Sequence, residues 1–394
     1  MQPWREIRAA RALLLAVVIG CVPAHALVTL NFNDGHDRVY VTATLGATHD
    51  SNVTASNGGQ GDFVYSAGLQ AEYTRRAGWI GVNANMAVNS SHFATLKGED
   101  FSNPSFGLEF TKQSGRTTGA LTLSAARLSR ADSVLNVRTT SWNYSAALDT
   151  AYPVVDRFKL TGQFGYAATK YVDAAYLVNL STYTAGLNMF YVYNTVRDLS
   201  AGYRYRYTQT SVSDSTTDHN FTVGMSGRLI RGLNGSVNVG YQFRVPHGGV
   251  NHTRASGLSA SGATSYAINR KLSLSGQISK DFTTTATDAS VDTTAADLGS
   301  SYAFNSQWGL GAGTGWGESK FLGQGGRVIL AVGPPEVFGP NRQDTFAHWD
   351  ASVNYSRNEH FKVSFSYGWF RNWSTVPYAD FVRASWNLKL NSRL

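Results

Sequence analysis

Four arginines recur on one side of an alternating pattern in the middle of this 394-residue sequence. Residues 203–207 read Tyr-Arg-Tyr-Arg-Tyr, and further arginines occur in the two segments that follow. Side chains of a β-strand point alternately to opposite faces, so an extended chain gathers the arginines on one face and the tyrosines on the other. A row of cations on an enclosed, hydrated face attracts and guides anions. The candidate residues for guiding anions along this face are Arg204, Arg206, Arg228 and Arg244.

Carboxylates share the face of these arginines, which leaves two interpretations of the charges. In the first, the arginines form a cationic lining that concentrates anionic solutes. In the second, the charges pair across neighbouring strands and merely hydrate the interior. The formal net charge of +8 is consistent with both interpretations. The acidic residues on the shared face are Glu72, Glu109, Asp149, Asp281, Asp297 and Asp350.

The elements that would position these residues are β-strands, because alternating apolar and polar residues run through most of the chain. The alternation extends from about residue 39 to residue 394, and no segment has a helical period. Aromatic residues make up 12%, as interfacial girdles require. We therefore predict an all-β fold, a transmembrane antiparallel up-and-down β-barrel of about 18 strands, within a range of roughly 16–18.

The predicted strands are joined by short charged turns that alternate with longer polar connections. This asymmetry is typical of bacterial outer-membrane barrels, whose short turns face the periplasm. An even strand number puts both ends of the barrel on that side. The predicted strands are 39–49, 62–75, 79–92, 104–112, 119–129, 139–152, 156–168, 180–193, 198–209, 219–230, 233–244, 256–268, 271–282, 293–304, 307–317, 345–356, 361–371 and 379–394.

The last predicted strand also fits an outer-membrane protein. Trp386, Leu388, Leu390 and Leu394 share one parity, and the chain ends on an apolar residue. This pattern is similar to the terminal strand that barrel-insertion machinery recognises. We therefore expect that machinery and outer-membrane lipid to be partners, and the outer membrane of a Gram-negative bacterium to be the location.

A glycine track precedes the longest connection. Glycines occupy every second position from residue 309 to residue 315, so one face of this strand carries no side chains. The connection, about residues 318–343, contains the apolar residues Phe321, Leu322, Val328, Ile329 and Leu330. One hypothesis is that it folds into the lumen against the glycines and narrows the pore. The alternative is an extended hairpin that projects outside.

The sequence contains little that indicates a catalytic site or a cofactor-binding site. The nearest acid–imidazole pairs are His49 with Asp50, Asp218 with His219, and His348 with Asp350, and no nucleophile is spaced to suggest a site. The glycine-rich residues 323–326 lack the Lys-Ser/Thr of a phosphate loop. No basic run suggests nucleic acid binding. We predict no enzyme activity, no cofactor and no metal.

Inward aromatics such as Trp79, Phe190 and Phe370 are too scattered to form a continuous aromatic track.

The N-terminus has the features of a secretory signal. Arginines precede an apolar core at residues 12–20, and Ala24-His25-Ala26 offers a small-x-small cleavage site. We therefore divide the chain into a signal peptide (1–26), a short periplasmic segment (27–38) and the barrel (39–394). A lipobox-like sequence ending at Cys21 is the alternative, which would leave that cysteine lipidated. Cleavage after Ala26 leaves no cysteine for a disulfide.

Two stretches resemble a known family. Residues 48–53 read Thr-His-Asp-Ser-Asn-Val, which is similar to the Asp-x-Asn-Val signature that opens the β-barrel porin 2 family. Residues 203–244 also resemble that family, with Asp-His-Asn-Phe at 218–221 and Gly-Tyr at 240–241. The resemblance implies an outer-membrane barrel, and many members are tied to exopolysaccharide production and export. It thereby implies an anionic polysaccharide and periplasmic export proteins as partners.

Three functions remain open from the sequence. The sharpest is passive export of an acidic exopolysaccharide, or passage of anionic solutes, along a polar lumen. The second is general diffusion of small solutes through a porin. The third is a structural or surface-binding barrel whose loops carry the function and whose pore does not conduct.

Overall fold

The computed structural model describes residues 30–32, 37–76, 78–172, 177–212, 214–248, 254–322, 327–328, 336–337, 342–358 and 360–393. The predicted signal peptide, with Cys21 and the cleavage site, lies outside the described residues. So does most of the predicted segment 27–38, of which β1 (Leu30–Phe32) pairs with the start of β2 (Asp37–Asp50). The barrel therefore begins two residues before the predicted boundary at residue 39.

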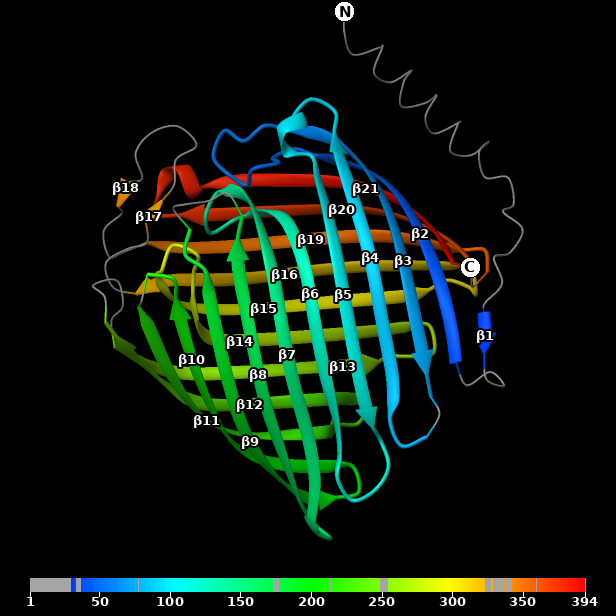
Figure 1. Cartoon of the computed structure of the whole chain (residues 1–394), viewed down its shortest axis with the longest axis vertical. Coiled ribbons are helices and arrows are strands. Elements are labelled where there is room, and N and C mark those ends of the chain that lie inside the picture. Colours follow the sequence, from blue (N-terminus) through cyan, green and yellow to red (C-terminus); the bar gives the residue numbers. More distant parts are fainter. Residues whose placement is uncertain are drawn as a thin grey trace, which may run out of the picture.

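Eighteen long strands form one closed antiparallel barrel, as the alternation predicts (Figure 1). Each pairs with its sequence neighbour, and β21 pairs with β2 to close the ring. Among the described residues, no helix is long and apolar enough to cross a bilayer. Besides β2, the barrel strands are β3 (Asp62–Arg75), β4 (Gly81–Phe93), β5 (Phe101–Lys112), β6 (Thr118–Asp132), β7 (Val137–Val155), β8 (Phe158–Tyr171), β9 (Leu180–Asn194), β10 (Arg197–Thr210), β11 (Ser215–Ile230), β12 (Leu233–His247), β13 (Ala255–Ala267), β14 (Leu272–Thr284), β15 (Ser290–Ala303), β16 (Trp308–Leu322), β19 (Gln343–Ser356), β20 (Phe361–Ser374) and β21 (Phe381–Arg393).

The two ends of the barrel differ in the connections they carry. The end where β2 starts and β21 finishes has short turns, such as residues 156–157 between β7 and β8, and we call it the turn end. The opposite end, the loop end, carries the short helices η2 (Lys97–Glu99) and η3 (Pro377–Ala379) and the small strand pair β17 (Arg327–Val328) and β18 (Glu336–Val337). Figure 1 shows the C-terminus and β1 at the turn end.

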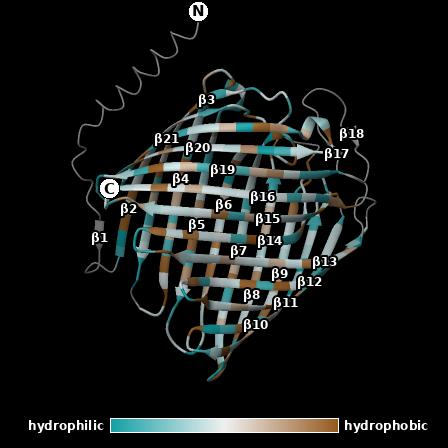
Figure 2. Ribbon diagram, turned by 180° about the vertical axis from the view of Figure 1, so that it is seen from behind, coloured by the Kyte–Doolittle hydropathy of each residue, from teal (hydrophilic) through white to brown (hydrophobic). Residues whose placement is uncertain are grey.

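Hydrophobic and hydrophilic residues alternate along many of the strands (Figure 2). Because successive side chains point to opposite sides, this alternation separates an apolar outer face from a polar inner face. In β16, Trp308, Leu310 and Trp316 point outward and are nearly half exposed. The glycines of the same strand, including Gly311 and Gly313, point to the enclosed side. An apolar exterior with aromatic residues near both ends matches the lipid contact of a transmembrane barrel.

Two hairpin tips leave the wall at the loop end. The β5–β6 ladder stops at Ser105–Ala126, although β6 continues to residue 132. The β13–β14 ladder stops at Ala260–Lys280, although β14 continues to residue 284. We call residues 127–138 the β6–β7 tip and residues 281–290 the β14–β15 tip.

The two tips meet across the mouth of the barrel. Their hairpins lie eight strands apart in the 18-strand ring, nearly opposite each other. Leu135 of the β6–β7 tip nevertheless packs against Ala286 of the β14–β15 tip and Leu177 of the β8–β9 loop, and all three are buried. Asn136 donates a 2.9 Å hydrogen bond from Nδ2 to the carbonyl of Ala55 in the β2–β3 loop. Protein therefore crosses the lumen at the loop end.

Candidate functional site

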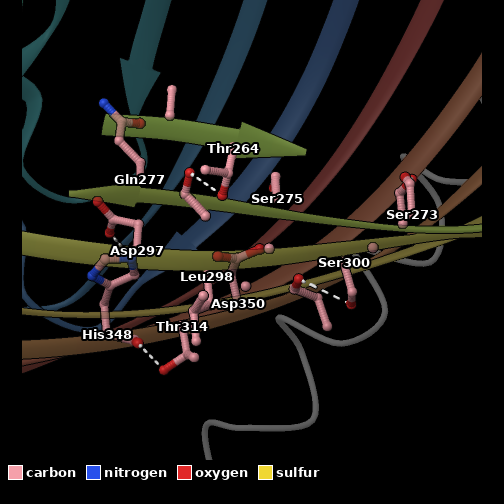
Figure 3. Close-up of a pocket in the computed structure, with 17 residues that line it drawn as sticks. Thr264, Ser273, Ser275, Gln277, Asp297, Leu298, Ser300, Thr314, His348 and Asp350 are labelled. Carbon is pink, nitrogen blue, oxygen red and sulfur yellow. Dashed lines mark hydrogen bonds and ion pairs between the residues drawn. The ribbon is translucent and has the colours of Figure 1, made fainter. Parts of the chain in front are cut away.

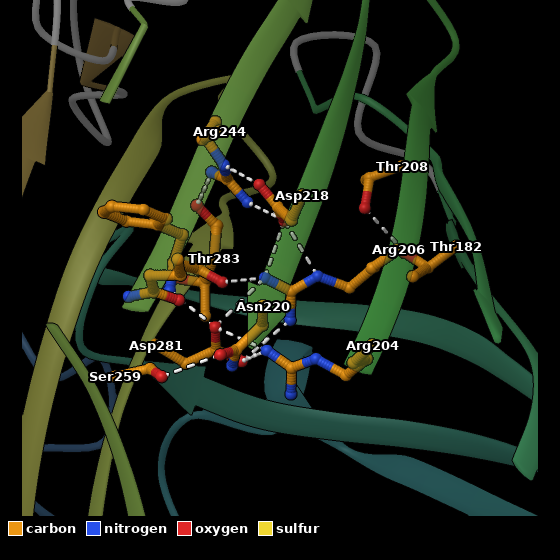
Figure 4. A network of polar contacts seen from close by, with 12 residues as sticks. Thr182, Arg204, Arg206, Thr208, Asp218, Asn220, Arg244, Ser259, Asp281 and Thr283 are labelled. Atoms are coloured by element: carbon orange, nitrogen blue, oxygen red, sulfur yellow. Dashed lines mark hydrogen bonds and ion pairs between the residues drawn. The ribbon is translucent and has the colours of Figure 1, made fainter. Parts of the chain in front are cut away.

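Three of the four candidate arginines lie together on the inner face near the loop end (Figure 4). Strand register places Arg206 of β10 opposite Asp218 of β11, and Asp218 opposite Arg244 of β12. Directly opposed side chains lie about 5 Å apart, so this row brings two guanidinium groups to one carboxylate. Arg204 is the next inward residue on β10.

Two carboxylates hold these three guanidinium groups. Asp218 accepts from Arg244 Nε at 2.6 Å and from Arg206 Nε at 2.9 Å. Asp281 of β14 accepts from Arg204 Nη2 at 2.8 Å and from Arg206 Nη1 at 2.9 Å. The side chains of Arg244 and Asp218 are 1% and 2% exposed, whereas that of Arg204 is 33% exposed. We call these five residues the arginine network, which carries one positive charge in excess.

The arginine network also binds the main chain of the β14–β15 tip. Arg206 Nη2 donates to the carbonyl of Phe282, and Arg244 Nη1 donates to the carbonyl of Thr283 at 2.7 Å. Both carbonyls lie beyond the end of the β13–β14 ladder, where a buried carbonyl needs another donor. The Arg244 guanidinium also lies 5.4 Å from the centre of the Phe282 ring. The network therefore fastens the β14–β15 tip to the inner wall.

Arg228 is not part of this network. It lies near the turn end of β11 with an exposed side chain, and its carbonyl accepts a 2.7 Å hydrogen bond from Arg197 Nε. At about 3.3 Å per residue along a strand, roughly 30 Å separates it from Asp218. The structure brings Arg204, Arg206 and Arg244 together and leaves Arg228 at the opposite end.

The residues of the predicted constriction loop are described only in part. Phe321 belongs to β16, is buried, and packs with Ala289 of the β14–β15 tip and Val291 of β15. The guanidinium of Arg342 lies 4.4 Å from the centre of its ring. Leu322 is the last residue of β16.

The rest of that loop lies largely outside the described residues. Val328 ends β17, while Ile329 and Leu330 lie outside the described residues. The loop's entry into the lumen stays a prediction, and among the described residues the two tips cross the mouth.

The β6–β7 tip has its own anchor, which the alternation of the sequence does not reveal. Arg138 lies on this tip, with Nε 3.3 Å from Glu99 Oε2 of η2. Its guanidinium lies 5.0 Å from the ring centre of Phe93 and 4.9 Å from that of Phe101. These partners come from a loop end two strands away, so only the folded tip brings them to the arginine.

The loops that meet at the mouth carry backbone strain. Outside glycine, the positive φ angles in the described part of the chain are 54° at Ala55, 57° at Asn136 and 61° at Asp288. Asn and Asp tolerate this left-handed conformation, whereas alanine is disfavoured there by roughly 1–2 kcal/mol. Each of the three residues lies in one of the converging loops, in a tight turn that its own N–H closes by a backbone hydrogen bond.

The acid–imidazole pairs noted in the sequence do not form a catalytic arrangement. Asp218 points inward while its neighbour His219 points outward, because adjacent strand residues face opposite sides. His348 points inward and lies 3.5 Å from Asp297 of β15. Within the described residues, no group of three or more His, Cys, Asp or Glu side chains could hold a metal ion.

Inward aromatics form a continuous run that the sequence analysis did not find. Phe346, Phe370 and Phe381 lie on β19, β20 and β21, with ring centres 6.0 Å and 5.6 Å apart along the run. The prediction that inward aromatics are too scattered to form a track is therefore wrong for these three residues, although Trp79 lies apart from them in an exposed turn. The run depends on the register of three consecutive strands, in which Phe346 and Phe381 both pair with Asn372, two residues from Phe370.

The closed 18-strand barrel, with short turns at one end and longer connections at the other, defines a protein of the Gram-negative outer membrane. The fold is similar to OccK5 (OpdH) from Pseudomonas aeruginosa, with a TM-score of 0.50, 10% identity and coverage of 91% of this chain and 98% of that one.

Two further solved structures are similar at slightly lower scores. OccK2 (OpdF) from Pseudomonas aeruginosa has a TM-score of 0.49, 13% identity and coverage of 91% and 97%. OccAB3 from Acinetobacter baumannii has a TM-score of 0.49, 10% identity and coverage of 91% and 99%. No protein-family model and no curated protein matches the sequence. The likeness shows the fold alone, and the resemblance to the porin 2 family stays a prediction.

Proposed function

We propose that this protein is a passive outer-membrane channel for small hydrophilic solutes. The observation that carries the proposal is the meeting of the two tips across the loop end, exemplified by the packing of Leu135 against Ala286. A passage crossed by two folded tips suits small solutes better than a polymer chain. Export of an acidic exopolysaccharide, the sharpest function predicted from the sequence, is not supported by the comparisons or by a mouth that two tips cross.

The inner wall suits uncharged polar solutes. Hydroxyl and amide groups bond across neighbouring strands there, as in Ser124 with Ser145 at 2.7 Å and Thr169 with Asn143 at 2.9 Å. Such a surface stays hydrated and exchanges hydrogen bonds with a passing solute at little cost. A polar interior of this kind is typical of diffusion porins.

The arginines support at most a weak preference for anions. Asp218 and Asp281 offset two of the three guanidinium charges, and Arg244 is sealed from the lumen. Arg204 remains a third exposed and carries the excess charge. We therefore assign these arginines chiefly to holding the mouth, with a minor electrostatic effect on entering ions.

Reconstitution tests the proposed function. The purified full chain is inserted into planar bilayers and into liposomes, and ion conductance and liposome swelling are measured with uncharged solutes of increasing size. We expect stepwise conductance, swelling with small solutes, and exclusion of polymers. Heat-denatured protein is the control. Absence of both conductance and swelling would show that the barrel is not a channel.

A further inference from the structure

A recess lies on the inner wall beside the glycine track of β16. Figure 3 shows the residues that line it. Its volume is about 470 Å³. The missing side chains of the track make room for it. A methyl group at Gly313 would collide with Asp350, and one at Gly315 with Asp297 and His348. The glycines thus let acidic and imidazole side chains from the neighbouring strands lie flat over the wall.

The groups around this recess both donate and accept hydrogen bonds. On the inward side of the strands, the recess is lined by hydroxyl and amide groups together with two carboxylates and an imidazole. No lysine or arginine is among its lining residues, so no cationic side chain there offsets the repulsion between an anion and the carboxylates of Asp297 and Asp350. The polar side chains that face inward are Ser273, Ser275, Gln277, Asp297, Ser301, His348 and Asp350.

A second recess continues the first toward the aromatic run. It has a volume of about 390 Å³ and shares His348 and Asp350 with the first. Its wall includes Phe370 and Phe381, whose rings stack with centres 5.6 Å apart. The only cation in its lining, Arg383, is held by Asp50 at 2.6 Å. Apolar ring faces therefore adjoin the hydrogen-bonding groups.

We propose that the two recesses together form a binding site for an uncharged polyhydroxylated solute, such as a monosaccharide or disaccharide. A sugar presents hydroxyl groups that both donate and accept, and its ring C–H groups pack on aromatic faces. Asp297 and Asp350 accept from sugar hydroxyls, while Phe370 contacts an apolar ring face. A simple cation would use the carboxylates but leave the serine and amide donors without partners. The proposal names a substrate class for the proposed channel and rests on that function.

Sugar block of the ion current tests the site. Open channels in planar bilayers are titrated with glucose and maltose, and the concentration that halves the current is measured. We expect block by sugar, and an increase of about tenfold or more in that concentration for Asp350→Asn and Gly313→Val, because hydrogen bonds to a carboxylate or the space itself are lost. For Phe370→Ala we expect an increase of severalfold.

Matched variants on the opposite wall serve as controls. Asp149→Asn alters an inward carboxylate of β7, and Phe190→Ala an inward aromatic of β9. Neither should change the sugar titration. Heat-dependent mobility on gels shows that every variant folds into a barrel.

The outcomes separate the site from the channel. Conductance without sugar block, or a block by arginine or lysine that sugar does not produce, would overturn the site and leave the channel intact. If no current is seen, equilibrium dialysis of radiolabelled glucose against the detergent-solubilised chain still measures binding. Sugar binding weakened by Asp350→Asn then supports the site while the channel fails, and no binding overturns both.

Discussion

The two tips that cross the mouth leave the wall in the same way but are held differently. Each continues beyond a ladder that stops early, at Ser105–Ala126 for one and at Ala260–Lys280 for the other. The β14–β15 tip is bound by several short charged hydrogen bonds from the arginine network, which reach the Asp281 carboxylate and the carbonyls of Phe282 and Thr283. The β6–β7 tip is held by an ion pair and two ring contacts of Arg138, by a neutral hydrogen bond from Asn136 to the carbonyl of Ala55, and by apolar packing of Leu135.

This difference indicates that one side of the mouth is fixed and the other adjustable. Charged hydrogen bonds that are shielded from water and bidentate have strict geometry. Contacts of a guanidinium with aromatic faces tolerate sliding and contribute less. We therefore expect the β6–β7 tip to move first when a solute passes, and the β14–β15 tip to serve as the surface against which it closes.

The largest effect is expected from Asp218→Ala. The change leaves Arg244, which is 1% exposed, without its carboxylate, and breaking such a buried pair costs about 3–5 kcal/mol. The free energy of unfolding in urea with lipid vesicles measures the loss, and a higher conductance reports release of the β14–β15 tip. Asp149→Ala, an exposed inward carboxylate, is the control. An equal loss of unfolding free energy in the two variants would contradict the conclusion that the arginine network fixes the β14–β15 tip.

A smaller effect is expected from Arg138→Ala. Its side chain is 10% exposed, and its ion pair with the part-exposed Glu99 and its cation–π contacts together contribute about 2–3 kcal/mol. Arg138→Lys should recover little, because an ammonium group lacks the planar surface that stacks on Phe93 and Phe101. The same unfolding assay measures both, with single-channel noise as a report of tip movement. If Arg138→Ala lowers the free energy of unfolding as much as Asp218→Ala does, the two tips are held equally firmly and the distinction between them fails.

The smallest effect is expected from Ala55→Gly, in the loop that receives Asn136. Glycine removes the strain of φ at 54° but adds freedom to the unfolded chain, so stability should rise by up to about 1 kcal/mol. Ala286→Gly, at a buried alanine of ordinary backbone conformation, is the control and should destabilise by roughly 0.5–1 kcal/mol. Destabilisation by Ala55→Gly would show that this strain is not relieved by the change.

Much of the barrel follows from the sequence, and part of the site does too. The period of two is a property of each strand alone, so the number of strands, their faces and the short-turn end could be predicted within a few residues. The same rule placed Arg204, Arg206 and Arg244 on one face. It could not predict that Asp218 and Asp281 form ion pairs with these arginines. That pairing depends on which strands lie close together in the barrel and on their register.

The sequence by itself determined which way each side chain points from its strand, because that alternation is local. Only the tertiary structure decided where the end of a strand leaves the barrel wall and turns into the lumen. Phe282 shares the outward parity of Ile278, which is exposed, yet it is 2% exposed because its strand turns inward beneath Arg244. Leaving a ladder requires new partners for the freed backbone. Those partners, Arg206 and Arg244 for the carbonyls of the β14–β15 tip, come from strands that only the closed barrel brings near.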